Sequence, residues 1–263
     1  ISLLLQTNVA ISTDGKKEIR EYLIGVLEKK IKKYKPETDY APFINSLIRD
    51  KPKLNSYSII HSIQTSLGQS MHEQVSKRIA QYGNKFDEAE TQWDSEIMIS
   101  RKRVAKIDEI LRQVTNGTRK PNRLTEQDEI LSIKNDGLVK KKAESIVDVY
   151  LRRGDDEFYF DIKTVKPNKP GFISHKQRIL TWIARANKPI TSAIVFPYNP
   201  YHPKPYKRIG FDIMSPDDVM IGKAYWDFLG GKGCYEEVLD LYEQVGKSVW
   251  TKLKEKIELD EST

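Results

Sequence analysis

Three charged residues lie within two stretches of the chain that are otherwise rich in β-branched and aromatic residues. Asp148 lies in SIVDVYLR (145–152), and Asp161 and Lys163 lie in EFYFDIKTV (157–165). This composition predicts two strands, and the RGDD between them predicts a turn, so together they form a hairpin. Charged residues inside apolar strands cost stability unless they are paired or bind a ligand. These three are therefore the first candidates for chemistry.

The register of the hairpin decides whether the three side chains meet. Because side chains alternate along a strand, Asp161 and Lys163 share one face. If Gly154 and Asp155 are the two turn residues, Asp148 pairs directly with Asp161, with Cβ atoms about 5 Å apart. Any even-length turn keeps the three on one face, whereas an odd length separates them.

Two adjacent carboxylates repel each other unless a cation lies between them. Mg²⁺ is the natural cation, since it takes oxygen ligands and the sequence offers no Cys or His cluster. A lysine beside the metal can orient or deprotonate a water and stabilise charge on phosphorus. The spacing Asp-x12-Asp-x-Lys therefore predicts metal-assisted hydrolysis of a phosphodiester. The alternative is an exposed hairpin face on which Asp161 and Lys163 pair with neighbours. Glu144 and Asp156 are nearby acids that we expect at a strand edge and in the turn.

Helices must carry much of the chain around this hairpin. Apolar residues recur at helical spacing before it, and Gly68 interrupts the longest pattern, where it indicates a break or a close backbone approach. After it, we expect a helix from Ser174, whose Ser174-x-x-Gln177 reads as a capping box. Ser215 with Pro216 predicts another helix start, and Gly230-Gly231 its end. The predicted helices before the hairpin span residues 16–33, 40–48, 56–82, 101–114 and 125–133; after it we predict a strand at 191–196 and a final helix at 235–257. This order predicts an α/β core.

The charge of the chain is strongly polarised. The net charge is +7 over 263 residues, from 44 basic and 37 acidic residues. Residues 162–211 contain no Asp or Glu but ten of the bases, so the remainder carries −3. A solvated basic face would explain this window, but a surface for a polyanion explains it better, because clustered Lys and Arg neutralise phosphates.

Composition also argues against several classes of protein. No apolar run approaches the roughly 18 residues of a membrane span, and the opening ISLLLQTNVAIS lacks the basic flank of a signal peptide. Cys234 is the single cysteine, which excludes internal disulfides and multi-cysteine zinc sites. We therefore expect a reducing compartment, the cytoplasm.

The hairpin residues IVDVYL…FYFDIKTVKPN resemble the PD-(D/E)xK nuclease motif of type II restriction endonucleases, with Val147 in the place of the motif's Pro. SLGQSMHE (66–73) resembles the helix that precedes the hairpin in these enzymes, and FPYNPY (196–201) and IGKAYWDFLGG (221–231) resemble later segments of one subgroup. The resemblance implies a restriction-endonuclease-like core, a central mixed sheet flanked by helices. It also implies Mg²⁺-dependent cleavage of double-stranded DNA at a short palindromic sequence, of the GGNCC kind in that subgroup, leaving 5′-phosphates. A homodimer and a cognate DNA methyltransferase in a prokaryotic cell are implied too.

The resemblance gives each site residue a role. Asp148 and Asp161 become metal ligands, and Lys163 the residue that orients water or stabilises charge. Glu73 becomes an auxiliary ligand. On a continuous helix, however, Glu73 points away from the apolar stripe and would be a solvated acid. Only a break near Gly68, or a second buried face of the helix, would bring it to the site. Gln177 is either a second residue of the site or only a helix cap.

The basic window supplies the predicted DNA contacts. Residues just beyond the metal site are expected to touch phosphates, which position DNA without reading it. The proline-rich loop after residue 196 is expected to read base edges, although turn geometry alone would explain Asn199. The phosphate candidates are Lys166, Asn168, Lys169, His175, Lys176, Gln177 and Arg178; the loop candidates are Tyr198, Asn199, Tyr201, His202, Lys204, Lys207 and Arg208.

Together these features predict a type II site-specific deoxyribonuclease. Its nuclease core spans residues 57–263, with recognition around 197–210, and residues 1–56 form a helical portion for dimerisation or DNA contact. Two alternatives stay open: a structure-specific repair or recombination nuclease of the same superfamily, and a catalytically silent DNA-binding protein with this fold.

Overall fold

The computed structural model of the protein describes residues 10–35, 42–83, 85–94, 98–136, 138–139, 146–164, 167–206 and 212–259. Its centre is a five-stranded mixed sheet with strand order β1-β4-β5-β6-β7. β1, β4 and β5 pair antiparallel, while β6 and β7 continue the sheet in parallel. The strands are β1 (Glu88–Trp93), β4 (Val147–Arg153), β5 (Asp156–Ile162), β6 (Thr191–Phe196) and β7 (Val219–Ile221); β2 (Ile99–Ser100) and β3 (Leu138–Val139) pair separately.

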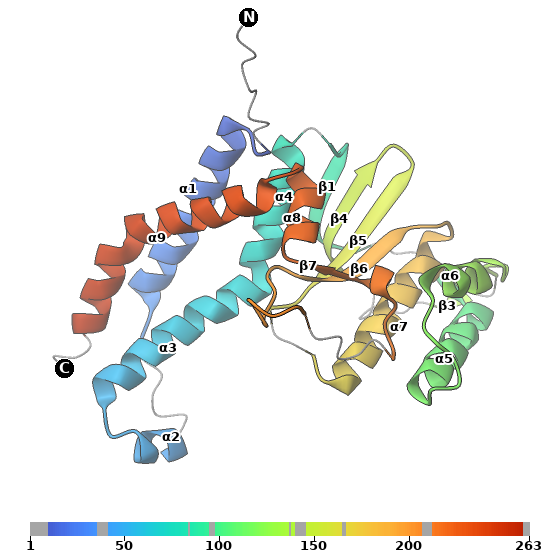
Figure 1. Cartoon of the computed structure of the whole chain (residues 1–263), viewed down its shortest axis with the longest axis horizontal. Coiled ribbons are helices and arrows are strands. Elements are labelled where there is room, and N and C mark those ends of the chain that lie inside the picture. Colours follow the sequence, from blue (N-terminus) through green and yellow to red (C-terminus); the bar gives the residue numbers. More distant parts are fainter. Residues whose placement is uncertain are drawn as a thin grey trace, which may run out of the picture.

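Helices cover both faces of the sheet, which confirms the predicted α/β core (Figure 1). One face packs on α4 (His72–Tyr82), α8 (Lys223–Gly230) and α9 (Cys234–Leu259), together with α1 (Thr13–Lys33). The other face packs on α5 (Arg101–Thr115), α6 (Arg123–Leu131) and α7 (Lys169–Ala186). Alternation along β5 divides its side chains between the two cores: Phe160 and Ile162 face the first, and Tyr159 the second.

The N-terminal helices are attached to this body rather than separate from it. Ile19 and Leu23 of α1 are fully buried in the first core, and α1 packs along α9 and α4. α2 (Pro42–Leu47) and α3 (Lys51–Ser66) lead away from the sheet and back to α4 (Figure 1). The predicted division of the chain near residue 57 stays a prediction. None of the helices within the described ranges combines the length and apolar character that a membrane span requires.

Two predicted helix starts are wrong. α7 begins at Lys169, not at Ser174, because the Asn168 side chain accepts the Gly171 N–H and Pro170 occupies the first turn. Ser174 and Gln177 therefore lie inside the helix and form no capping box. The Ser215 start gives only a short 3₁₀ turn (Pro216–Asp218), after which the chain enters β7.

Candidate active site

The hairpin has the register that places the two aspartates opposite each other. Gly154 and Asp155 form its two-residue turn, with Gly154 in the left-handed region at φ 58°. Val149 pairs with Phe160, so the next pair in this register is Asp148 with Asp161. Asp148 Oδ2 accepts a hydrogen bond of 2.8 Å from the N–H of Ile162. The two carboxylates thus meet where β4 begins and β5 ends.

Three basic side chains surround Asp161. Lys163 lies just beyond β5, and its Nζ is 2.8 Å from Asp161 Oδ1 and 3.6 Å from Asp148 Oδ2. Arg178 Nη1 donates to the same Oδ1 at 2.6 Å, and His175 Nδ1 lies 2.6 Å from Oδ2. Both of these residues come from α7, because the Asp161 side chain faces the helix layer that α7 belongs to. The arrangement concentrates positive charge around one buried carboxylate.

The pKa values of the two aspartates are shifted in opposite directions. Burial alone would raise the pKa of Asp161, but the His175 ring, Lys163 and Arg178 outweigh burial and hold this pKa below its ordinary range. Burial and the Asp161 charge raise the pKa of Asp148, against the opposing effect of Lys163. The bases therefore compensate Asp161 more fully than Asp148.

Glu73 reaches this cluster because the helix before it is not continuous. A π-helical turn (Leu67–Met71) separates α3 from α4, and Glu73 follows it in the first turn of α4 with only 5% of its surface exposed. A β-carbon at Gly68 would lie 2.7 Å from Thr164 Oγ1, so any larger residue at this position would force Thr164, two residues beyond β5, to shift. Burial raises the pKa of Glu73 to about 7.

Gln92 joins the acids and is absent from the sequence prediction. Its Nε2 donates to Glu73 Oε2 at 2.9 Å and lies 3.5 Å from Asp148 Oδ1. Gln92 is in β1 opposite Asp148, and its φ of 51° is unusual for a residue other than glycine. β1 reads EAETQW, which has little β-forming character except at Thr91 and Trp93. Those two residues were the only local signal of this strand.

The acidic groups that could bind a cation here are the carboxylates of Glu73, Asp148 and Asp161. Glu73, Asp148 and Asp161 converge on Gln92 and Lys163 through the contacts given above. In the described ranges, no group of three or more His, Cys, Asp or Glu residues is arranged to hold a metal ion. A cation here would take up oxygens that now contact Gln92 and the bases.

One predicted DNA contact on α7 is corrected by the structure. Lys176 has no exposed surface, and its Nζ lies 2.5 Å from both Glu126 Oε2 and Asp218 Oδ2. A lysine buried in this way offers nothing to a phosphate, so its role is structural. Gln177 is half-buried inside α7, and its side chain makes no hydrogen bond to the described part of the chain.

The other predicted DNA contacts on α7 differ in whether their side chains already contact other residues of the protein. His175 and Arg178 contact Asp161, as described above. Asn168 Oδ1 caps the helix by accepting the Gly171 N–H, whereas Lys169 is exposed.

The proline-rich loop lies beside the cluster. Tyr198 donates to the Thr164 carbonyl at 3.1 Å and lines a cavity of about 350 Å³ together with Lys163 and residues of α3. The Asn199 amide accepts from Tyr201 N and donates to the Lys204 carbonyl, which is the turn role that the sequence left open. His202 and Lys204 are exposed. Lys166, Lys207, Arg208 and Glu144 lie outside the described residues. Asp156 is exposed, but it is the first residue of β5 and not part of the turn, where the sequence analysis expects it.

Comparison with known proteins gives a consistent result. A type II restriction endonuclease family model, HinfI, matches residues 11–246. The type II restriction enzyme HgiEI of Herpetosiphon aurantiacus is 25% identical over 280 residues, covering 95% of this chain and 99% of that protein. The type II restriction enzyme MjaII of Methanocaldococcus jannaschii is 28% identical over 208 residues, covering 71% of this chain and 54% of that protein. No solved structure matches.

Proposed function

The chain belongs to the HinfI family of type II restriction endonucleases, and we propose that Asp148, Asp161, Lys163 and Glu73 form its active site for cleaving double-stranded DNA. The observation that carries this proposal is the convergence of the three carboxylates and Lys163 at one end of the hairpin. These residues come from three separate segments, and one of them, Lys163, also lines the cavity of about 350 Å³. The proposed reaction leaves 5′-phosphates.

Mg²⁺ is the proposed cofactor, and the donor chemistry fits it. Asp148, Asp161 and Glu73 offer only hard oxygen ligands, which suit Mg²⁺ better than a soft metal. Their burial and mutual repulsion raise the pKa values of Asp148 and Glu73, as expected for acids whose charge is under-compensated. Bound by these residues, Mg²⁺ would supply electrostatic stabilisation of charge on phosphorus and a nucleophilic water at neutral pH.

The protein's own residues prepare the site for a phosphodiester. Lys163 Nζ is held by Asp161 yet lies at the wall of the cavity, so it can orient a water or stabilise charge on the phosphate. Arg178 and His175 keep Asp161 ionised and fix its position. Ile162 fixes Asp148 through its N–H. The site is thereby ordered before DNA binds, which lowers the cost of reaching the transition state.

Further properties are proposed from the family resemblance. A short palindromic sequence has twofold symmetry, and a homodimer is the assembly that matches it. A restriction enzyme acts on DNA in the cytoplasm of a prokaryotic cell, where a cognate methyltransferase would protect the host sequence.

The test is cleavage of plasmid DNA by the purified protein in Mg²⁺ and then in EDTA. We expect discrete fragments in Mg²⁺ and none in EDTA. Asp161→Asn and Asp148→Asn should abolish cleavage while leaving DNA binding intact. Asp156→Asn, at an exposed acid of the same hairpin, is the matched control and should cut normally.

The alternatives predict other results. A smear, or cleavage of branched DNA only, would indicate a repair or recombination nuclease. Binding without cleavage would indicate a silent nuclease fold. Retained cleavage by Asp161→Asn would show that the active site lies elsewhere.

A further inference from the structure

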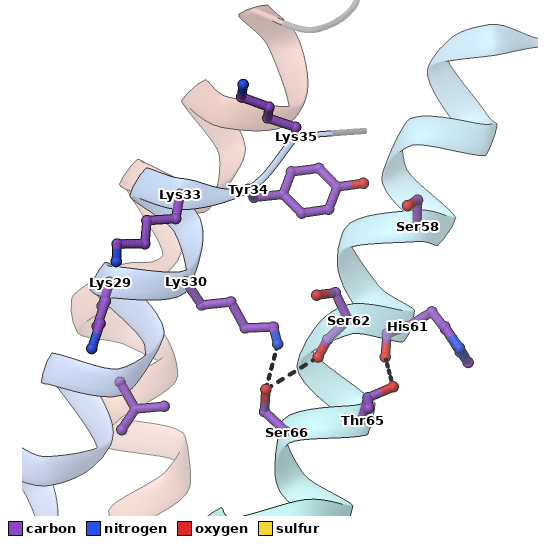
Figure 2. A pocket seen from close by; sticks show the side chains of 11 residues that line it. Lys29, Lys30, Lys33, Tyr34, Lys35, Ser58, His61, Ser62, Thr65 and Ser66 are labelled. Carbon is purple, nitrogen blue, oxygen red and sulfur yellow. Dashed lines mark hydrogen bonds between the residues drawn. The ribbon is translucent and has the colours of Figure 1, made fainter. Parts of the chain in front are cut away.

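A second cleft, rich in lysine, lies between α1 and α3. We call it the lysine groove; it has a volume of about 830 Å³. In Figure 2 the Lys30 side chain crosses the gap between the two helices toward Ser66, and the Tyr34 ring also extends toward α3. Lys30 donates to Ser66 Oγ, and Ser66 donates in turn to the Ser62 carbonyl. The basic residues of the lining are Lys29, Lys30, Lys33, Lys35 and His61.

The positive charge of the lysine groove is not compensated locally. None of the residues that line it is acidic. In the described part of the chain, Lys29, Lys30, Lys33 and Lys35 form no ion pair with a carboxylate. The nearest acid in sequence on α1 is Glu28, which pairs instead with Lys252 of α9. Ammonium groups kept together without carboxylates are favourable only where counterions or a polyanion can approach.

The lysine groove lies next to the cavity of about 350 Å³ that Lys163 lines, which we call the Lys163 cavity. His61 and Thr65 line both spaces, and both residues are exposed. Ser58 lines the lysine groove and Gly68 lines the Lys163 cavity; they lie ten residues apart along the helix, about 15 Å at 1.5 Å per residue. This length corresponds to about four base pairs at 3.4 Å each. The Lys163 cavity has no acidic lining residue either, so of the proposed active-site residues only Lys163 lines it.

We propose that the lysine groove binds backbone phosphates of the DNA that flanks the cleaved bond. This inference rests on the proposed function, because it requires DNA at the proposed active site beside the Lys163 cavity. Lysine ammonium groups and the Ser and Thr hydroxyls of α3 are typical partners of phosphate oxygens, and such contacts position a duplex without reading its sequence. The groove sets where the duplex lies along α3, and through α3 where the scissile phosphate lies relative to Lys163.

The test compares two double variants with equal loss of charge. Lys30→Gln with Lys33→Gln removes two groove lysines. Lys17→Gln with Lys32→Gln removes two exposed lysines of the same helix that do not line the groove. Binding to a 30-base-pair duplex of mixed sequence is measured in EDTA by fluorescence anisotropy over a range of NaCl concentrations.

We expect the plot of log binding constant against log salt concentration to be shallower for the groove variant than for the wild type. Its slope should fall in magnitude by about 1.8, at about 0.9 per phosphate contact. This corresponds to a loss of affinity of tens of fold at 0.1 M salt. The control variant should keep the wild-type slope. Lys30→Arg with Lys33→Arg retains the charge and should bind as the wild type does, which separates charge from any effect on folding.

Each other outcome overturns the inference. An unchanged slope in the groove variant, with wild-type plasmid cleavage intact, would refute the lysine groove but not the proposed function. If the wild-type protein does not cleave plasmid DNA in the separate assay, the proposed function itself is refuted, and the inference that rests on it falls too. A change of mass in light scattering from dimer to monomer, with an unchanged slope, would make the groove an interface between two copies. A wild type that binds no duplex would overturn both proposals.

Discussion

Replacing Lys176 with methionine should lower the free energy of unfolding far more than removing any surface charge would. Lys176 lies in a neutral buried quartet with Glu126, Asp218 and Arg123. Its Nζ is 2.5 Å from each carboxylate, and both pairs of side chains are fully buried. Arg123 Nη1 is 3.6 Å from Asp218 Oδ1. The substitution therefore leaves two buried carboxylates with one guanidinium.

The size of the effect follows from this imbalance. Removing one partner of a buried ion pair costs about 3–5 kcal/mol, because a charge stays buried without its counter-charge. At roughly 2–4 °C per kcal/mol for a chain near this size, the melting temperature should fall by about 10 °C. Adding Glu126→Gln restores the charge balance, so Lys176→Met with Glu126→Gln should recover at least half of the loss.

Urea unfolding of the wild type, both single variants and the double variant measures the coupling between the two residues. DNA binding of the folded Lys176→Met protein is measured in parallel. The reasoning fails if Lys176→Met loses less than about 1 kcal/mol of stability while the salt slope of DNA binding falls by about 0.9, the value for one phosphate contact. That result would make Lys176 the DNA ligand that its sequence position suggested.

Three further outcomes are expected. Gly68→Ala should lower the cleavage rate between about 10- and 100-fold, because its β-carbon would lie 2.7 Å from Thr164 Oγ1; the double variant with Thr164→Ala should recover most of the rate. Burial raises the pKa of Cys234 to about 12, so native alkylation by iodoacetamide at pH 8, followed by mass spectrometry, should be about 10³-fold slower than for a free thiol and should rise about tenfold per pH unit. Rapid native labelling would contradict this burial. Lys204→Ala should weaken duplex binding and lower the salt slope by about 0.9 in anisotropy titrations; an unchanged slope would remove Lys204 from the DNA surface.

The hairpin was predictable because the residues that determine its strands and its register are adjacent in the sequence. Strand composition identified the two strands, and the two-residue turn fixed the register that brings Asp148 opposite Asp161. The strand at Thr191–Phe196 and the last helix were predictable for the same reason, since their patterns are strong and uninterrupted. The approach of Glu73 was one of two open alternatives, and Gly68 was the residue on which the choice depended.

The parts that escaped prediction depend on contacts distant in sequence. Gln92 matters only because β1 lies beside β4, and a weak edge-strand pattern does not reveal that pairing. Lys176 reads as one of a basic series, and only the tertiary packing of α6 and of the turn before β7 encloses it. The start of α7 was misplaced because two capping signals compete six residues apart, and Asn168 with Pro170 outweighs Ser174.

The π-helical turn at Leu67–Met71 also fixes how α4 is rotated about the helix axis relative to α3. A residue inserted into an α-helix rotates everything after it by about 100° relative to everything before it. One extra residue in the π-helical turn therefore sets the rotation between two helix faces. These are the face of α3 that lines the lysine groove and the face of α4 that carries Glu73. Deleting one residue from this turn would rotate one face out of alignment with the other, although every side chain that contacts substrate would still be present.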